Sequence, residues 1–197
     1  MDLKNKLNER ISKWALLQHP LYQAWEKGEL PVEALQTYAR EYGAFIRLMP
    51  AGWESLRDNE TANEEREHAA LWRDFAAGLN TEISDAKLPA VAALVEISAK
   101  LFAGPATALG ALYAFEAQQP ETAKTKLAGL RKHYSLPASV EPYFEKHSAN
   151  EHEAAKLLDR ILVLTAEDQA IALEACEQMS AALWNALTDI YDTHVKM

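Results

Sequence analysis

The sequence has few of the features that stabilise small secreted proteins or that cross membranes. Cys176 is the one cysteine among 197 residues, so an internal disulfide cannot form. The apolar runs are all shorter than the roughly 20 residues that a membrane-spanning helix needs. The opening segment, MDLKNKLNERISKW, is polar where a signal peptide would be apolar. We therefore expect a cytoplasmic protein without membrane contacts, in which Cys176 is a small core residue rather than a nucleophile.

Basic residues are also in the minority. The chain has 20 Lys and Arg against 29 Asp and Glu, which gives a formal net charge of -9 and a pI near 5.2. The basic residues form no stripe that would locally overcome this charge. An acidic surface repels the phosphates of nucleic acids and of anionic lipids. Nucleic acids and membrane surfaces are therefore not expected partners.

The residues that are present indicate one compact helical domain over residues 1–197. Apolar side chains recur at intervals of three and four residues, and period-two alternation typical of strands is not found. This pattern predicts an all-α, up-and-down bundle of about seven to eight helices. The helices are expected at residues 3–18, 21–27, 31–59 with a break at Pro50, 63–79, 89–103, 105–118, 121–134, 141–164 and 167–195.

Two of the predicted helices carry a histidine and a carboxylate on their apolar faces. In the helix 141–164, His147 and Glu151 are four residues apart and can point to the same place in the core. Near residues 63–79, Glu65 and His68 form a Glu-x-x-His motif, the spacing that di-iron bundles use to direct two ligands to one metal pair. A single such motif also arises by chance, and Glu60 and Glu64 compete for the inward position.

Glu116 is the most informative carboxylate in the sequence. It lies in the segment PATALGALYAFEAQQP and is flanked by apolar residues over two turns of helix. A buried carboxylate without a partner costs several kcal/mol or is forced to bind a proton. Taken singly, a core histidine is usually hydrogen bonded and inert. Two histidines and two or three glutamates on three helices instead favour a common partner, and iron or manganese suits such mixed ligands.

Three segments resemble the haem-oxygenase-like superfamily, in the group that contains TenA and PqqC. Residues 19–50, HPLYQAWEKGELPVEALQTYAREYGAFIRLMP, are similar to the opening of that group. LYAFEAQQP resembles its central glutamate helix, and YFEKH its late helix with a metal-binding histidine. The resemblance is strongest to the branch of non-haem di-iron oxidases that includes the CADD-type p-aminobenzoate synthases.

This resemblance implies a set of metal ligands. In that branch a metal pair is held by a Glu and a His of one helix, a Glu of a central helix, and His-x3-Asp-x2-His of a late helix. The matching residues here are Glu60 or Glu65 with His68, then Glu116, His147 and Glu151. Ala154 stands where the last histidine is expected, and His152 is displaced from it by two residues. The sequence therefore leaves open whether one or two ions bind.

The main hypothesis is a non-haem iron enzyme that uses O2, with one or two Fe ions or possible Mn in their place. Its substrate is a small organic molecule or, as the resemblance implies, a tyrosine of the protein itself. Tyr22, Tyr38 and Tyr42 are the candidate catalytic tyrosines, and Trp72 is expected beside them. Glu41, between Tyr38 and Tyr42, is either a further ligand or a hydrogen-bonded structural residue.

Two alternatives belong to the same fold. The first is a metal-free protein that binds a small ligand, in which Glu116 is protonated or paired with a neighbour such as His147. The second is a hydrolase of the thiaminase type. That branch has a cysteine nucleophile one turn before the tyrosine that corresponds to Tyr113, where this sequence has Leu109. Relatives are commonly dimers, so a homodimer is expected.

Overall fold

The protein is entirely helical over the residues that the computed structural model describes, which are 2–150 and 152–195. Within these ranges eight helices have ten or more residues, which confirms the predicted all-α bundle. The helices are α1 (Leu3–Ser12), α2 (Pro20–Lys27), α3 (Val32–Ile46), α4 (Met49–Ser55), α5 (Asn59–Gly78), α6 (Pro89–Leu101), α7 (Pro105–Glu116), α8 (Gln119–His133), α9 (Pro142–Ser148), α10 (His152–Leu162) and α11 (Ala166–Val195). Short 3-10 turns lie at Leu16–Gln18 and Ala138–Val140.

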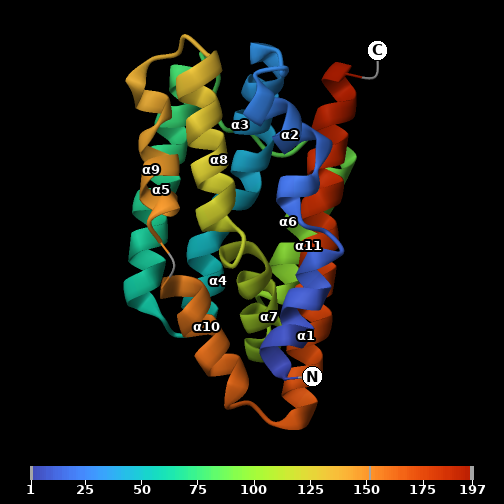
Figure 1. Cartoon of the computed structure of the whole chain (residues 1–197). Helices are drawn as coiled ribbons and strands as arrows, with labels where there is room; N and C mark the ends of the chain where they lie inside the picture. The colour runs from blue at the N-terminus through green and yellow to red at the C-terminus, as the bar shows by residue number, and fades with distance from the viewer. Residues whose placement is uncertain (1, 151, 196–197) are drawn as a thin grey trace.

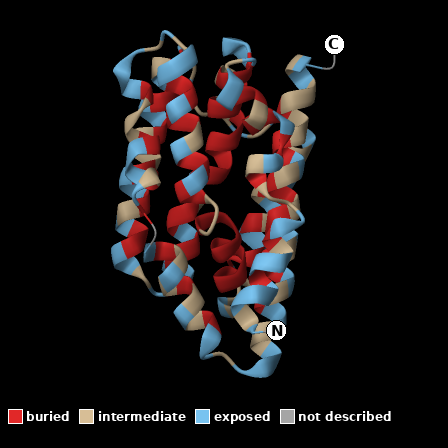
Figure 2. Ribbon diagram, viewed as in Figure 1, coloured by how far each residue is buried: buried red, intermediate tan, exposed pale blue. Residues whose placement is uncertain are grey.

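The longest helix, α11, runs along one side of the bundle and packs against α1, α6 and α7 (Figure 1). On the other side α5 and α9 lie together, and α8 packs against both α9 and α2. Buried residues line the inward faces of the helices, and exposed residues cover the outside (Figure 2). The lower end of α9 and the upper end of α10 meet beside α5 near the middle of the bundle as drawn (Figure 1).

Proline marks where several helices begin. It stands in the first turn of α2, α6, α7, α8 and α9, where its missing N–H group is not needed by the helix. Pro50 has the same role in α4, so the break predicted at this residue divides the segment 31–59 into α3, α4 and the start of α5. The side chain of Asp58 accepts a hydrogen bond from the backbone N–H of Thr61 and caps α5.

The predicted first helix is too long. Instead of continuing to residue 18, α1 ends at Ser12, and Ala15 takes an extended backbone conformation before the 3-10 turn. The backbone N–H of Leu16 then donates to Gln118 Oε1 at 2.9 Å. This change of direction places the Leu16 side chain in the core, where it is fully covered. The tertiary contact outweighs the local preference for helix.

The predicted helix over residues 141–164 is also wrong, because it is two helices. α9 ends at Ser148, where the backbone N–H of Asn150 bonds to the His147 carbonyl, and α10 begins at His152. The interruption rotates the following residues relative to α9. Glu153, rather than Ala154, faces the core as a result.

The two helices α7 and α11 approach each other closely at Gly110. A Cβ atom at this position would overlap the backbone carbonyl of Ala172. Glycine is required here by the close approach of the backbones rather than by its freedom of conformation. None of the helices in the described part of the chain is both long and apolar enough to cross a membrane.

Candidate metal centre

Five buried side chains from four helices meet inside the bundle. Glu65 and His68 come from α5, Glu116 from the last turn of α7, His147 from α9 and Glu153 from the start of α10. The ligand atoms of Glu65, His68 and His147 all lie within 4.8 Å of one another. The same is true of the carboxylate oxygens of Glu65, Glu116 and Glu153. Glu65 belongs to both groups, so it can bridge two neighbouring ions.

The two histidines are oriented by hydrogen bonds to one ring nitrogen each. His147 Nδ1 lies 2.9 Å from the backbone carbonyl oxygen of Tyr143, so this nitrogen carries the proton and donates it. His68 Nδ1 lies 2.8 Å from Glu65 Oε1. The Nε2 atoms of both rings have no hydrogen-bond partner among the described residues. A metal-binding histidine is typically held in this way, with one nitrogen fixed and the other available.

The pKa values of the two imidazoles shift in opposite directions. Burial lowers the pKa of His147 to about 3, and the charge of neighbouring His68 acts in the same direction. Burial also opposes protonation of His68, but the hydrogen bond that His68 donates to Glu65 and the charges of Glu65 and Glu153 outweigh it, so the pKa of His68 is raised. His147 is therefore neutral at physiological pH, the form that binds metals.

The carboxylates are held in an environment that disfavours their charge. Burial raises the pKa of Glu116 well above its usual range, and the nearby charges of Glu153 and Glu65 raise it further. Burial likewise raises the pKa of Glu65 in spite of its hydrogen bond with His68. Like charges that share a buried site repel one another unless a cation or a proton lies between them.

The polar atoms that lack partners show that these residues fit a metal. Glu116 Oε1, Glu153 Oε1 and the two imidazole Nε2 atoms are buried without a hydrogen-bond partner in the described part of the chain. Most buried polar groups in folded proteins have a partner. Two imidazoles and three carboxylates form the kind of ligand set that suits iron or manganese.

The structure separates the predicted ligands into three classes. Four of the predicted ligands come together, namely Glu65, His68, Glu116 and His147. Of the two alternatives on α5, Glu65 faces inward and Glu60 is exposed. Glu151 lies outside the described residues. Glu41 is structural, since its Oε2 atom accepts hydrogen bonds from the backbone N–H groups of Lys87 and Leu88 at 2.7 and 3.0 Å, where α6 begins.

Sequence reasoning missed Glu153. Its position six residues after His147 does not fit a continuous helix, and the break between α9 and α10 is what turns it inward. The segment Ser148-Ala149-Asn150, rich in small and polar residues, was the available signal for that break. Glu153 lies one residue before Ala154, the position at which the resemblance implies the last histidine.

Comparison with known proteins identifies the family of the chain. A profile of the family described as iron-containing redox enzymes, with a haem-oxygenase-like fold, matches residues 47–185. The chain belongs to this family. It is 29% identical to a 4-aminobenzoate synthase of Chlamydia muridarum, covering 95% of this chain and 89% of the relative. It is 30% identical to a 4-aminobenzoate synthase of Nitrosomonas europaea, covering 97% and 92%.

Solved structures show the same fold at lower sequence identity. A domain of Shewanella denitrificans with a heme oxygenase-like fold has a TM-score of 0.82 at 16% identity, covering 98% of this chain and 93% of that one. A TenA homologue of Pseudomonas syringae has a TM-score of 0.77 at 15% identity, covering 96% and 91%. The predicted haem-oxygenase-like fold and the resemblance to the TenA and CADD groups are confirmed.

The tyrosines predicted to be catalytic lie in a second buried cluster of side chains, beside the candidate metal centre. The Tyr22 and Tyr38 hydroxyl oxygens are 3.0 Å apart, and the ring of Tyr42 stacks on that of Tyr38. Lys126 from α8, which sequence reasoning also missed, places its Nζ atom 3.4 Å from the Tyr22 hydroxyl and 3.2 Å from the Tyr38 hydroxyl. Burial lowers the pKa of Lys126 to about 7.

Aromatic rings connect this cluster to the metal centre. The ring centroid of His147 lies 4.2 Å from that of Tyr143, which lies 4.6 Å from that of Trp72. Trp72 in turn lies 5.4 Å from Tyr38. The tyrosine cluster and the centre are therefore neighbouring parts of one core, joined by close ring contacts.

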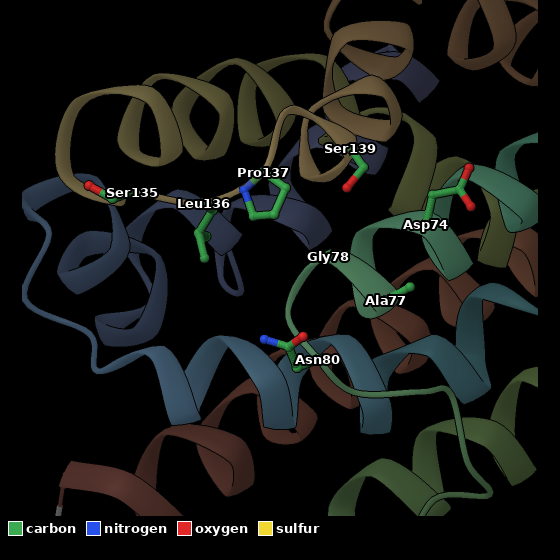
Figure 3. Close-up of a pocket in the computed structure, with 8 residues that line it drawn as sticks. All are labelled: Asp74, Ala77, Gly78, Asn80, Ser135, Leu136, Pro137 and Ser139. Atoms are coloured by element: carbon green, nitrogen blue, oxygen red, sulfur yellow. The ribbon is translucent and has the colours of Figure 1, made fainter.

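The surface grooves differ in their relation to the centre. A groove of about 460 Å³ lies between the end of α5 and the loop after α8 (Figure 3). Its lining residues include Asp74, Asn80 and Ser139, none of which belongs to either buried cluster. A smaller pocket of about 180 Å³ is lined in part by His68 and therefore borders the centre itself.

Proposed function

We propose that the protein is an O2-dependent non-haem iron oxidase whose iron binds at Glu65, His68, Glu116, His147 and Glu153. The observation that carries this proposal is the set of buried imidazole and carboxylate atoms without partners in the described part of the chain. Membership of the iron-containing redox enzyme family supports the choice of metal. When bound, iron would supply the one-electron chemistry that activates O2.

The ligand set favours two ions rather than one. Its two groups of three residues share Glu65 and otherwise differ, with His68 and His147 in one group and Glu116 and Glu153 in the other. A shared carboxylate between two such groups is the arrangement found in di-iron helical bundles. Manganese prefers similar ligands and is a possible occupant of one position.

The substrate that the geometry favours is a tyrosine of the protein itself, Tyr22 or Tyr38. Both are fully buried, lie within the ring contacts that lead from His147, and have phenol groups beside an amine. Burial raises the pKa of Tyr22, while the lowered pKa of Lys126 leaves much of its Nζ unprotonated near neutral pH. Lys126 Nζ can therefore accept the phenol proton when the ring is oxidised.

The name of the relatives indicates the class of product. They are 4-aminobenzoate synthases, and 4-aminobenzoate has a benzene ring substituted at both ends, as the side chain of tyrosine has. We propose that this chain oxidises its own tyrosine ring, with O2 as the oxidant, as a step toward a product of this class. The rings of Trp25, Tyr42 and Trp72 pack around Tyr38 and hold it in place.

The two alternatives receive less support from the structure. In a metal-free binding protein Glu116 would be protonated or paired with a neighbour such as His147. The raised pKa of Glu116 fits the protonated form, but the described residues provide no hydrogen-bond partner for its Oε1 atom. A hydrolase of the thiaminase type needs a reactive thiol. Leu109 is buried where that thiol would stand, and burial on α11 raises the pKa of Cys176 to about 12, so this thiol is unreactive.

Metal analysis after anaerobic loading with Fe(II) tests the proposed centre. We expect two irons per chain in the wild type and a loss of iron in His68→Ala and Glu116→Ala, since each variant removes a ligand. Glu41→Gln is the matched control and should retain full loading, because Glu41 binds the start of α6. Stoichiometric iron in His68→Ala or Glu116→Ala would contradict the assignment.

Mass spectrometry of the intact chain tests the substrate. After O2 is admitted to the iron-loaded protein, the mass should change in the wild type and in Tyr42→Phe. If Tyr22 is the substrate, the mass should stay constant in Tyr22→Phe. If Tyr38 is the substrate, the mass should stay constant in Tyr38→Phe. If the mass of the wild type does not change while iron is bound, the substrate is a separate molecule.

A further inference from the structure

The small pocket beside His68 opens to the surface where α5 faces the junction of α9 and α10. It has a volume of about 180 Å³ and is lined by Glu64, His68, Lys146, Ala149, Asn150 and His152. His152 is exposed and Glu64 is half-buried, so both lie at its rim, whereas His68 is only 1% exposed and forms its floor. A ligand of the buried centre is thus the innermost wall of a surface pocket.

The rim of this pocket carries a further group of possible metal ligands. The ligand atoms of Glu64, His152 and Glu153 all lie within 4.8 Å of one another. Glu153 also belongs to the buried group with Glu65 and Glu116. One carboxylate therefore connects an exposed set of ligands with the interior set.

Asn150 provides an independent indication that a ligand binds here. Its side chain is 9% exposed and lines the pocket, and Oδ1 has no hydrogen-bond partner among the residues described. Burying an amide oxygen without a hydrogen-bond partner costs free energy, and a bound cation would offset this cost. Oxygen and imidazole ligands together suit a divalent transition metal ion.

The charges around the pocket act in opposite directions. Glu64 at the rim and the carboxylates of Glu153 and Glu65 below it attract a cation. Lys146, which is exposed on α9 and lines the same pocket, repels one. Electrostatic fields of this kind change the rate at which a small ion reaches a site more than they change its final occupancy.

We propose that Glu64, Asn150 and His152 form a transit site, at which a divalent metal ion binds first and from which Glu153 passes it to the buried centre. The proposal rests on the metal centre proposed above. It adds a pathway by which the metal ion reaches that centre. Glu64 and His152 at the rim belong to this pathway and are not ligands of the final site.

The rate of Co(II) uptake tests this pathway, since Co(II) is stable in air and its absorption reports binding. Metal-free protein is mixed with a small excess of Co(II) in a stopped-flow instrument, and the cobalt that remains bound after removal of the excess is then measured. The double variant Glu64→Gln/His152→Ala should take up Co(II) about tenfold more slowly and reach the same final content. Lys146→Gln should take it up faster.

Glu67→Gln is the matched control, because Glu67 is exposed on the same helix and does not line the pocket. It should load at the rate of the wild type. An unchanged rate in the double variant would overturn the transit site and leave the centre intact. A reduced final cobalt content would overturn it also, because Glu64 or His152 would then be a permanent ligand. If the wild type binds no Co(II), the proposed centre falls together with the pathway.

Discussion

Glu41 and Glu116 are equally buried, at 2% exposure, yet their surroundings differ in one respect. Glu41 Oε2 accepts two hydrogen bonds from backbone N–H groups, and Oε1 lies 3.5 Å from the Arg40 guanidinium. Glu116 Oε1 has no such partner within the described ranges, and burial raises its pKa well above the usual value. Burial alone therefore does not distinguish the two carboxylates, whereas the missing hydrogen-bond partner makes Glu116 the candidate ligand.

The partners of Glu41 come from the start of a helix. The residue before α6, Leu88, has no side chain that can cap the helix, and Glu41 from α3 takes over this role. A carboxylate at a helix N-terminus also interacts favourably with the helix dipole. The α3–α6 corner thus satisfies its buried charge within the protein, whereas the centre between α5, α7, α9 and α10 would need the cation that we propose for it.

The largest expected effect comes from Glu41→Gln. The neutral amide weakens two hydrogen bonds at the start of α6 and loses the ion pair with Arg40, so the free energy of unfolding should fall by about 2 kcal/mol. Urea denaturation of the metal-free protein measures this effect. The iron content should not change. If Glu41→Gln is as stable as the wild type, then Glu41 and Glu116 differ less than their contacts indicate.

The sequence predicted much of this fold and part of the site for physical reasons that can be stated. Helical spacing placed His68 and Glu116 on inward faces, because a residue's face depends only on periodicity, and it left Glu60, Glu64 and Glu65 as alternatives. The same spacing could not separate Glu41 from Glu116, because a hydrogen-bond partner on another helix leaves no local signal. Glu153 was missed for a related reason, since its direction depends on a short break in the chain.

Lys126 extends the comparison to a buried cation, and its pH dependence gives the next largest effect. Its pKa is about 7 in the folded protein and near 10.4 in an unfolded chain, so between these values the unfolded state binds more protons. Stability should therefore rise with pH above 7, by at most about 1.4 kcal/mol per pH unit. Urea denaturation at pH 7, 8 and 9 should show this rise in the wild type and not in Lys126→Met.

Lys124→Met is the control for this prediction. Lys124 lies on the same helix and pairs with Glu121 at the surface, so its pH profile should match that of the wild type. Parallel profiles for the wild type and Lys126→Met would mean that Lys126 keeps its proton in the folded protein. In that case the tyrosine cluster, like Glu41, satisfies its charge internally, and Lys126 is not the base proposed for the phenol proton.

Glu116→Gln gives the smallest effect, but its sign is the most informative. In the metal-free protein this change removes one of three buried carboxylates that lie within 4.8 Å of one another. Because burial raises the pKa of Glu116, folding the wild type at pH 7.5 carries the cost of either burying its charge or binding a proton, which glutamine does not carry. The free energy of unfolding should therefore rise by about 1 kcal/mol. With Fe(II) present the wild type should instead be more stable than Glu116→Gln. Fe(II) that binds only the folded state stabilises the wild type, and the variant lacks this stabilisation. The same substitution would thus stabilise at Glu116 and destabilise at Glu41. A loss of stability at both positions would mean that Glu116 has an internal partner, and the argument for a metal at this carboxylate would fail.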